Sequence, residues 1–95
     1  MGKDIKDRLI RIERFIVLYG KAWGQPLKEI KIENISFETL KNIVIPKKDD
    51  PLLYDGYILD ITQLESLNKL IENKINININ SFNYILECNG IYDWS

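Results

Sequence analysis

The segment Lys47–Ile61 (KKDDPLLYDGYILDI) separates two stretches that have a helical pattern of apolar residues. Pro46 stands directly before this segment, and a proline pushes the residue that precedes it, here Ile45, out of the α-helical region. A helix that reaches Ile45 therefore ends there. The sequence predicts two short helices, joined by this segment through a loop and a short apolar strand.

The first helix is predicted to begin at Ser36, because a serine oxygen can accept a hydrogen bond from a free N–H of the first turn. Glu38 places a negative charge in that turn, where the helix dipole favours it. Its apolar face consists of Phe37, Leu40, Ile43 and Val44. We expect this face to be buried.

The second helix is predicted to begin with a capping box, in which Thr62 and Glu65 each satisfy a backbone donor at the other residue. Its apolar stripe consists of Leu64, Leu67, Leu70 and Ile71. Asn73 is suited to end the helix.

Residues 5–19 are compatible with two structures. Ile5, Leu9, Ile12, Ile16 and Tyr19 recur at helical spacing, which favours a helix. Residues 15–19, however, form a continuous β-branched and aromatic run that is typical of a buried strand. After a loop at residues 21–26, residues 27–32 tend to alternate. We interpret both stretches as antiparallel strands, with or without a turn of helix before the first.

The segment Ile75–Asn80 alternates isoleucine with asparagine, which predicts a half-buried edge strand. Residues 82–88 again leave two alternatives. They form either a strand or a short helix that is capped by Ser81 and ends at Asn89–Gly90. We favour the strand. The tail 91–95 contains two aromatic residues and is expected to pack against the domain or to contact a partner.

Together these elements predict an α+β fold, an antiparallel sheet with two helices packed on one face. A chain of 95 residues suits one domain, residues 1–95.

Cysteine and histidine usage restricts the possible chemistry. Cys88 is the one cysteine, which excludes an internal disulfide and a cysteine zinc site, and we expect it in the core. The chain has no histidine, so the commonest general base and metal ligand is absent. The first residues are too charged for a signal peptide, and no apolar run is long enough to span a membrane. We expect a cytoplasmic protein.

Asp49 and Asp50 are the one candidate pair for acid–base catalysis. Adjacent side chains in a loop usually point apart into water, and Lys47 and Lys48 would keep both carboxylates ionised. The acidic residues from Asp49 onwards do not have the spacing of an EF-hand calcium loop. We therefore expect no enzyme activity, no metal and no cofactor.

Charge is distributed unevenly. Residues 1–48 have a net charge of +5 and residues 49–95 a net charge of −6. Such asymmetry indicates either a charged partner or neutralisation between the halves. Arg8, Arg11 and Arg14 would form a phosphate-binding stripe on a helix but would split between the faces of a strand.

The acidic residues of the central segment are interleaved with tyrosines. The candidate partner-binding residues are Asp49, Asp50, Asp55, Asp60, Tyr54 and Tyr57. Carboxylates accelerate the approach of a Lys/Arg-rich protein, and rigid aromatics supply buried anchors. In the alternative interpretation the tyrosines close the core and the aspartates cap helices.

Several of these residues also carry a resemblance. These features resemble a family of small uncharacterised bacterial domains with a DDP…D-x-Y…Y-x-Leu-Glu pattern: Asp49-Asp50-Pro51, Asp55 followed by Tyr57, the capped helix from Thr62, and the run Phe82-Asn83-Tyr84-Ile85-Leu86-Glu87-Cys88. The resemblance covers residues 36–88. Small acidic proteins of this kind are similar to immunity proteins of contact-dependent inhibition and other polymorphic-toxin systems.

The resemblance implies an immunity protein that binds a cognate toxin domain, a basic nuclease, and occludes its active site by charge complementarity. The alternative is a general protein-interaction module or regulatory subunit without a toxin. A third hypothesis is a small nucleic-acid-binding protein that uses the three arginines, although a pI near 5.4 and the position of Glu13 within the stripe argue against it.

Overall fold

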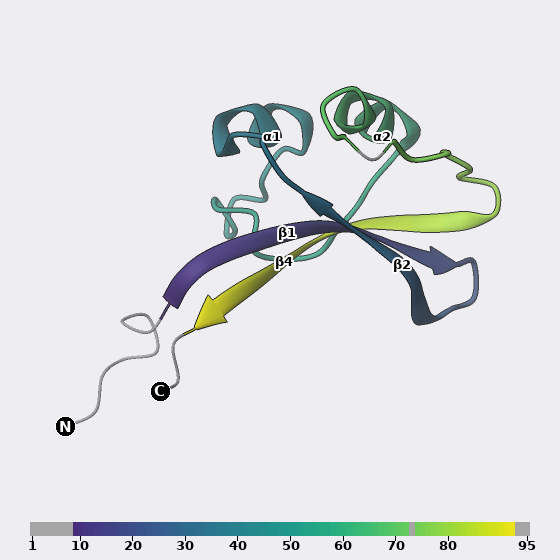
Figure 1. Cartoon of the computed structure of the whole chain (residues 1–95), viewed down its shortest axis with the longest axis horizontal. Helices are drawn as coiled ribbons and strands as arrows, with labels where there is room; N and C mark the ends of the chain where they lie inside the picture. Colours follow the sequence, from purple (N-terminus) through teal and green to yellow (C-terminus); the bar gives the residue numbers. More distant parts are fainter. Residues whose placement is uncertain (1–8, 73, 93–95) are drawn as a thin grey trace.

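The structure is a computed structural model that describes residues 9–72 and 74–92 (Figure 1). Its elements, in chain order, are β1 (Leu9–Gly20), β2 (Trp23–Ile32), α1 (Phe37–Ile43), β3 (Tyr57–Ile58), α2 (Ile61–Asn68) and β4 (Phe82–Tyr92). The four strands form one antiparallel sheet in the order β2-β1-β4-β3. Both helices lie on the same face of this sheet, which confirms the predicted α+β fold.

The hydrophobic core lies between the helices and this face of the sheet. The helices contribute Leu40, Leu64 and Leu67, and the sheet contributes Ile16, Ile30, Tyr84 and Leu86, all buried. Residues that alternate with these on the strands point to the other face, which no helix covers. The sheet therefore has one covered and one open face.

β1 is a strand along its whole described length, so the helical alternative for residues 5–19 is wrong from Leu9 onwards. Ile16 and Val17 are adjacent in sequence and both buried, with exposed fractions of 0% and 3%. Burial of consecutive residues is typical of a central strand, because successive side chains point to opposite faces. Residues 5–8, where a turn of helix was considered, lie outside the described residues.

The loop between β1 and β2 is shorter than the predicted 21–26. β2 already begins at Trp23, which pairs with Gly20. Trp23 and Gly24 both have positive φ values, +67° and +76°. This left-handed backbone reverses the chain tightly.

α1 begins as predicted: the Ser36 side chain accepts a hydrogen bond from the Thr39 N–H at 3.1 Å. α2 does not begin at Thr62. Its N-cap is Asp60, whose carboxylate accepts the Gln63 N–H at 2.8 Å, while the Gln63 side chain accepts the Asp60 N–H at 2.9 Å. The capping box therefore lies two residues earlier than predicted, because Asp60 and Gln63 can satisfy each other.

The buried stripe of α2 also differs at one residue. Leu64 and Leu67 are fully buried and Ile71 is 3% exposed, as predicted, but Leu70 is 46% exposed. The helix ends at Asn68, so Leu70 lies beyond it and turns outward.

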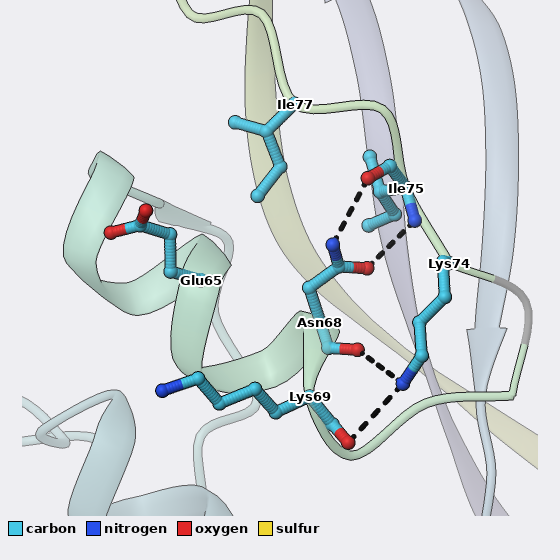
Figure 2. Close-up of a pocket in the computed structure, with 6 residues that line it drawn as sticks. All are labelled: Glu65, Asn68, Lys69, Lys74, Ile75 and Ile77. Carbon is cyan, nitrogen blue, oxygen red and sulfur yellow. Dashed lines mark hydrogen bonds between the residues drawn. The ribbon is translucent and has the colours of Figure 1, made fainter.

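The predicted strand at residues 75–80 does not form (Figure 2). Instead, the side-chain amide of Asn68 makes two hydrogen bonds with the backbone of Ile75, donating to its oxygen at 3.0 Å and accepting from its nitrogen at 2.7 Å. The Lys74 ammonium donates to the carbonyl oxygens of Asn68 and Lys69 at 2.8 and 3.2 Å, and so satisfies the end of α2. Ile75 is still buried and Ile77 half-buried, but Ile79 is 38% exposed, so the predicted inward alternation holds only for the first two isoleucines.

The strand alternative for residues 82–88 is confirmed, and the helical one is wrong. β4 pairs with β1 along its length, and a turn precedes it in which the Ser81 and Phe82 N–H groups donate to the Asn78 oxygen. Cys88 lies on β4 and is only partly buried; burial raises the pKa of its thiol. Of the tail, residues 93–95 lie outside the described residues.

The open face of the sheet is partly covered by its own side chains. The Tyr19 hydroxyl donates to the Glu87 carboxylate at 2.6 Å, and this bond raises the pKa of Tyr19. In the pairing of β1 with β4, three successive pairs face this side of the sheet: Tyr19 with Asn83, Val17 with Ile85, and Phe15 with Glu87. Tyr19 and Glu87 therefore lie on either side of the middle pair. The bond therefore spans the pair Val17–Ile85 on this face, and both of these residues are buried.

Candidate functional site

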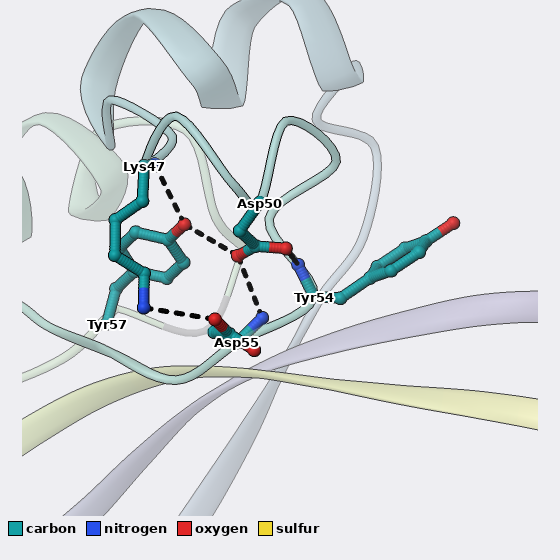
Figure 3. Close-up of polar contacts among 5 residues, drawn as sticks. All are labelled: Lys47, Asp50, Tyr54, Asp55 and Tyr57. Carbon is teal, nitrogen blue, oxygen red and sulfur yellow. Dashed lines mark hydrogen bonds and ion pairs between the residues drawn. The ribbon is translucent and has the colours of Figure 1, made fainter.

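The segment between α1 and β3 is organised around one carboxylate (Figure 3). Asp50 is 7% exposed. Its Oδ1 accepts the Tyr54 N–H at 2.9 Å, and its Oδ2 accepts the Asp55 N–H at 2.9 Å and the Tyr57 hydroxyl at 2.6 Å. We call residues 47–57 the Asp50 loop, because these three bonds fix its shape.

The backbone of the Asp50 loop forms two successive turns. The Asp50 N–H donates to the Lys47 oxygen at 2.9 Å, and the Leu53 N–H donates to the Asp50 oxygen at 3.2 Å. Leu53 has a φ of +56° and is fully buried. Leucine rarely adopts this left-handed conformation, so the surrounding contacts hold it there.

Tyr57 joins both ends of the loop. Its hydroxyl donates to Asp50 and accepts the Lys47 N–H at 3.1 Å. The Lys47 ammonium makes an ion pair with Asp55 at 3.0 Å and lies 5.4 Å from the centre of the Tyr57 ring. The hydrogen bond that its ammonium donates to Asp55 is the main reason why the pKa of Lys47 is raised.

These contacts determine the protonation of the loop. The hydrogen bond from Tyr57, followed by those from the two backbone N–H groups, lowers the pKa of Asp50. Burial and the hydrogen bond to Asp50 raise the pKa of Tyr57. At neutral pH the pair is therefore a carboxylate that accepts from a phenol, a short charge-assisted hydrogen bond.

Arg14 of β1 attaches the loop to the sheet. Its guanidinium donates to the Leu52 oxygen at 2.7 Å and lies 5.3 Å from the centre of the Phe37 ring. Its Nε is buried without a hydrogen-bond partner in the described part of the chain. The loop is thus held by its own carboxylate and by a strand more than thirty residues earlier in the sequence.

The six predicted partner-binding residues occupy different environments. Asp49, Tyr54, Asp55 and Asp60 are exposed, Tyr57 is half-buried and Asp50 is buried. Asp60 is also the N-cap of α2. The expectation that Asp49 and Asp50 both point into water is wrong for Asp50, because its carboxylate turns inward to three donors.

The sequence interpretation missed two exposed apolar residues beside these acids. Leu52 is 47% exposed and Ile58 is 69% exposed, and Tyr54 between them is 48% exposed. The signal for Asp50 was present in the sequence, since an aspartate at a turn commonly accepts downstream backbone N–H groups. No comparable signal marked Leu52, because its exposure depends on the turn at Leu53.

The arginine stripe considered for nucleic acid does not form on the described strand. Arg14 faces the helices, whereas Arg11 donates to Glu13, two residues away on the other face. Arg8 lies outside the described residues.

Ion pairing leaves the two halves of the chain largely separate. In the described part of the chain there are five ion pairs, and four of them join residues of the basic half: Arg11–Glu13, Lys31–Glu13, Lys31–Glu33 and Lys41–Glu38. Of these five, only Lys47–Asp55 joins the basic half to the acidic half.

Among residues 9–72 and 74–92, no three Cys, Asp or Glu side chains are grouped as metal ligands. None of the described helices has the length and apolar character needed to cross a membrane.

Comparison with known proteins assigns most of the chain to a family. Residues 13–87 match the family described as "Domain of unknown function (DUF7683)". The matched region includes both helices, the Asp50 loop and most of β1 and β4. Comparison with curated proteins gives no match, and neither does comparison with solved structures.

Proposed function

This chain belongs to the DUF7683 family, and for this member we propose the function of an immunity protein, which binds a cognate toxin domain without catalysis. The partner is a basic nuclease domain, and binding neutralises it by occluding its active site. Such a protein acts in the cytoplasm, because a nuclease toxin meets its substrate there.

The observation that supports this proposal most directly is that three hydrogen bonds to the Asp50 carboxylate hold the Asp50 loop in one conformation. A loop that is held in one conformation before binding loses less conformational entropy when a partner binds, so more of the contact energy becomes affinity. The loop displays Leu52 and Tyr54, each nearly half exposed. Rigid aromatic residues of this kind are enriched among the anchors of protein interfaces.

The charges around the loop support a basic partner. Asp49 and Asp55 of the Asp50 loop are exposed, as is Lys48, and Asp55 makes a surface ion pair with Lys47. An active site that binds nucleic acid is lined with cations for the phosphates. Carboxylates that approach these cations accelerate association and exclude the substrate.

The test uses the product of the gene next to that of this protein as the candidate toxin. Its nuclease activity is measured with and without the protein, and association rates are measured as a function of salt. Screening reaches about 8 Å at physiological ionic strength, so wild-type association should slow as salt rises. The double variant Asp49→Asn/Asp55→Asn should associate more slowly and with a flatter salt dependence. The control Glu65→Gln/Glu72→Gln removes the same charge from exposed sites outside the loop.

Truncation of Tyr54 tests the anchor. Tyr54→Ala should weaken binding by about 2 kcal/mol, mainly through faster dissociation. Ile79→Ala, an exposed apolar residue before β4, is the control and should leave dissociation unchanged. Full nuclease activity at saturating wild-type protein would contradict the immunity function. Unchanged binding by both loop variants would place the interface elsewhere.

A further inference from the structure

The two edges of the sheet differ in length. β3 consists of two residues, and the chain then turns away into α2. β2 has ten residues and, within residues 9–72 and 74–92, pairs only with β1. From Lys28 to Ile32 the pairing with β1 is regular, so the outer side of this run presents a straight row of backbone groups that no described strand pairs with. Such a row is a template for another strand.

A groove follows this edge. Its volume is about 520 Å³, and it is lined by residues 28–31 of β2, by Glu33 and by Glu72 and Lys74, which follow α2. The groove therefore lies beside the backbone that a further strand would contact.

The side chains of the edge are complementary to themselves. In a two-fold symmetric antiparallel pair, one residue lies opposite its own copy and its neighbours lie opposite each other's copies. With Ile30 at the centre, Glu29 lies opposite Lys31 of the second copy, and Lys31 lies opposite Glu29. This gives two opposite-charge pairs on the open face of the joined sheet.

The other symmetric registers are unfavourable. Centring the pair on Lys28, Glu29 or Lys31 sets a charged residue directly against its own copy, which is destabilising. Centring it on Ile32 extends the pairing past the end of β2.

We propose that β2 binds the β2 strand of a second copy of this chain, antiparallel and centred on Ile30, so that two sheets join into one. Ile30 is 7% exposed and belongs to the core, so the two cores approach each other through the Ile30 pair. The Asp50 loop stays available, since β3, which follows it, is the opposite edge of the sheet. Five paired residues make a small interface, so the dimer should be in a concentration-dependent equilibrium with the monomer.

Sedimentation equilibrium tests for the dimer: the wild-type protein should show the mass of two chains at high concentration.

Charge-reversal variants test the register of the two β2 strands. In Glu29→Lys, lysine lies opposite lysine, and the affinity of dimerisation should fall about tenfold or more. Lys31→Glu should have the same effect, because glutamate then lies opposite glutamate. An equimolar mixture of the two variants restores two opposite-charge pairs and should dimerise again. Glu65→Lys changes the charge as Glu29→Lys does, at an exposed site of α2, and should dimerise like the wild type.

Two further measurements keep the result interpretable. Lys31 also pairs with Glu13 at 2.9 Å within one chain, so thermal melting must show that Lys31→Glu is folded. Amide hydrogen exchange of the wild-type protein locates the interface independently of any variant. Exchange in residues 28–32 should slow as concentration rises. A wild-type mass of one chain, or a dimer without protection of these amides, would overturn the proposal.

Discussion

The hydroxyl of Tyr57 donates a 2.6 Å hydrogen bond to Oδ2 of Asp50, seven residues earlier in the sequence. The same carboxylate also accepts the N–H groups of Tyr54 and Asp55, so three hydrogen bonds converge on it. The buried side chain of Asp50 therefore stabilises the conformation of the exposed residues of the Asp50 loop.

Tyr57→Phe removes the hydroxyl and keeps the ring. We expect the free energy of unfolding to fall by about 1 kcal/mol, equivalent to about 4–8 °C in Tm for a chain of this size, as for one net hydrogen bond. Thermal melting measures the change. An unchanged Tm would show that the bond contributes nothing to the fold.

Asp50→Asn should lower the Tm at least twice as much as Tyr57→Phe. An asparagine has only one acceptor oxygen in place of two, and its NH₂ group would meet a donor, so at least one buried N–H or O–H is left unsatisfied. Asp49→Asn is the matched control. Its side chain is exposed, and we expect a change in Tm close to zero.

The stability that Asp50 provides should depend on pH. Its pKa is lower in the folded protein than in the unfolded chain, so this stability is fully present above the unfolded-state pKa of about 3.9. It is lost as the pH falls below that value through the folded-state pKa. The difference in Tm between the wild type and Asp50→Asn should be constant above about pH 5 and shrink towards about pH 2. A difference that does not change over this range would contradict the lowered pKa.

Leu67→Ala should lower the free energy of unfolding by about 2–4 kcal/mol, because Leu67 is a fully buried residue of α2 and its truncation leaves a cavity. Urea denaturation measures this cost. Leu70, three residues further on, is 46% exposed, and Leu70→Ala should cost clearly less. Equal costs would show that the two residues are equally buried.

Asp60→Ala removes the N-cap of α2 and should destabilise the protein by about 1 kcal/mol. Thr62→Ala, inside the first turn, should have little effect. If urea denaturation showed that Thr62→Ala is more destabilising than Asp60→Ala, the N-cap would be Thr62 and not Asp60.

The sequence predicted those parts of the fold that depend on neighbouring residues. Ser36 caps α1 as expected, because its partner Thr39 is three residues away. The prediction at Thr62 was wrong because two capping boxes overlap, Asp60 with Gln63 and Thr62 with Glu65. The sequence alone does not show which of the two forms.

Contacts between side chains and partners seven or more residues away account for the other errors. The alternation at residues 75–80 places Ile75 and Ile77 inward as predicted, but Ile79 is 38% exposed and the segment is not a strand. The side chain of Asn68 takes the backbone groups of Ile75 that a strand would have paired. Likewise, the inward turn of Asp50 requires Tyr57, and the anchoring of its loop requires Arg14 on β1. Helical and strand periodicities predict neither contact, and Arg14 lies 38 residues before Leu52.

The central position of β1 and β4 has a consequence for biosynthesis. These strands pair along their whole length, although Gly20 and Asn83, which share a hydrogen bond, are 63 residues apart. Until β4 has left the ribosome, β1 has only β2 beside it, and an isolated hairpin is marginally stable in water. Contacts between distant residues also make folding slow. The nascent chain therefore exposes the apolar side chains of β1 until β4 has been translated, and the sheet assembles only afterwards.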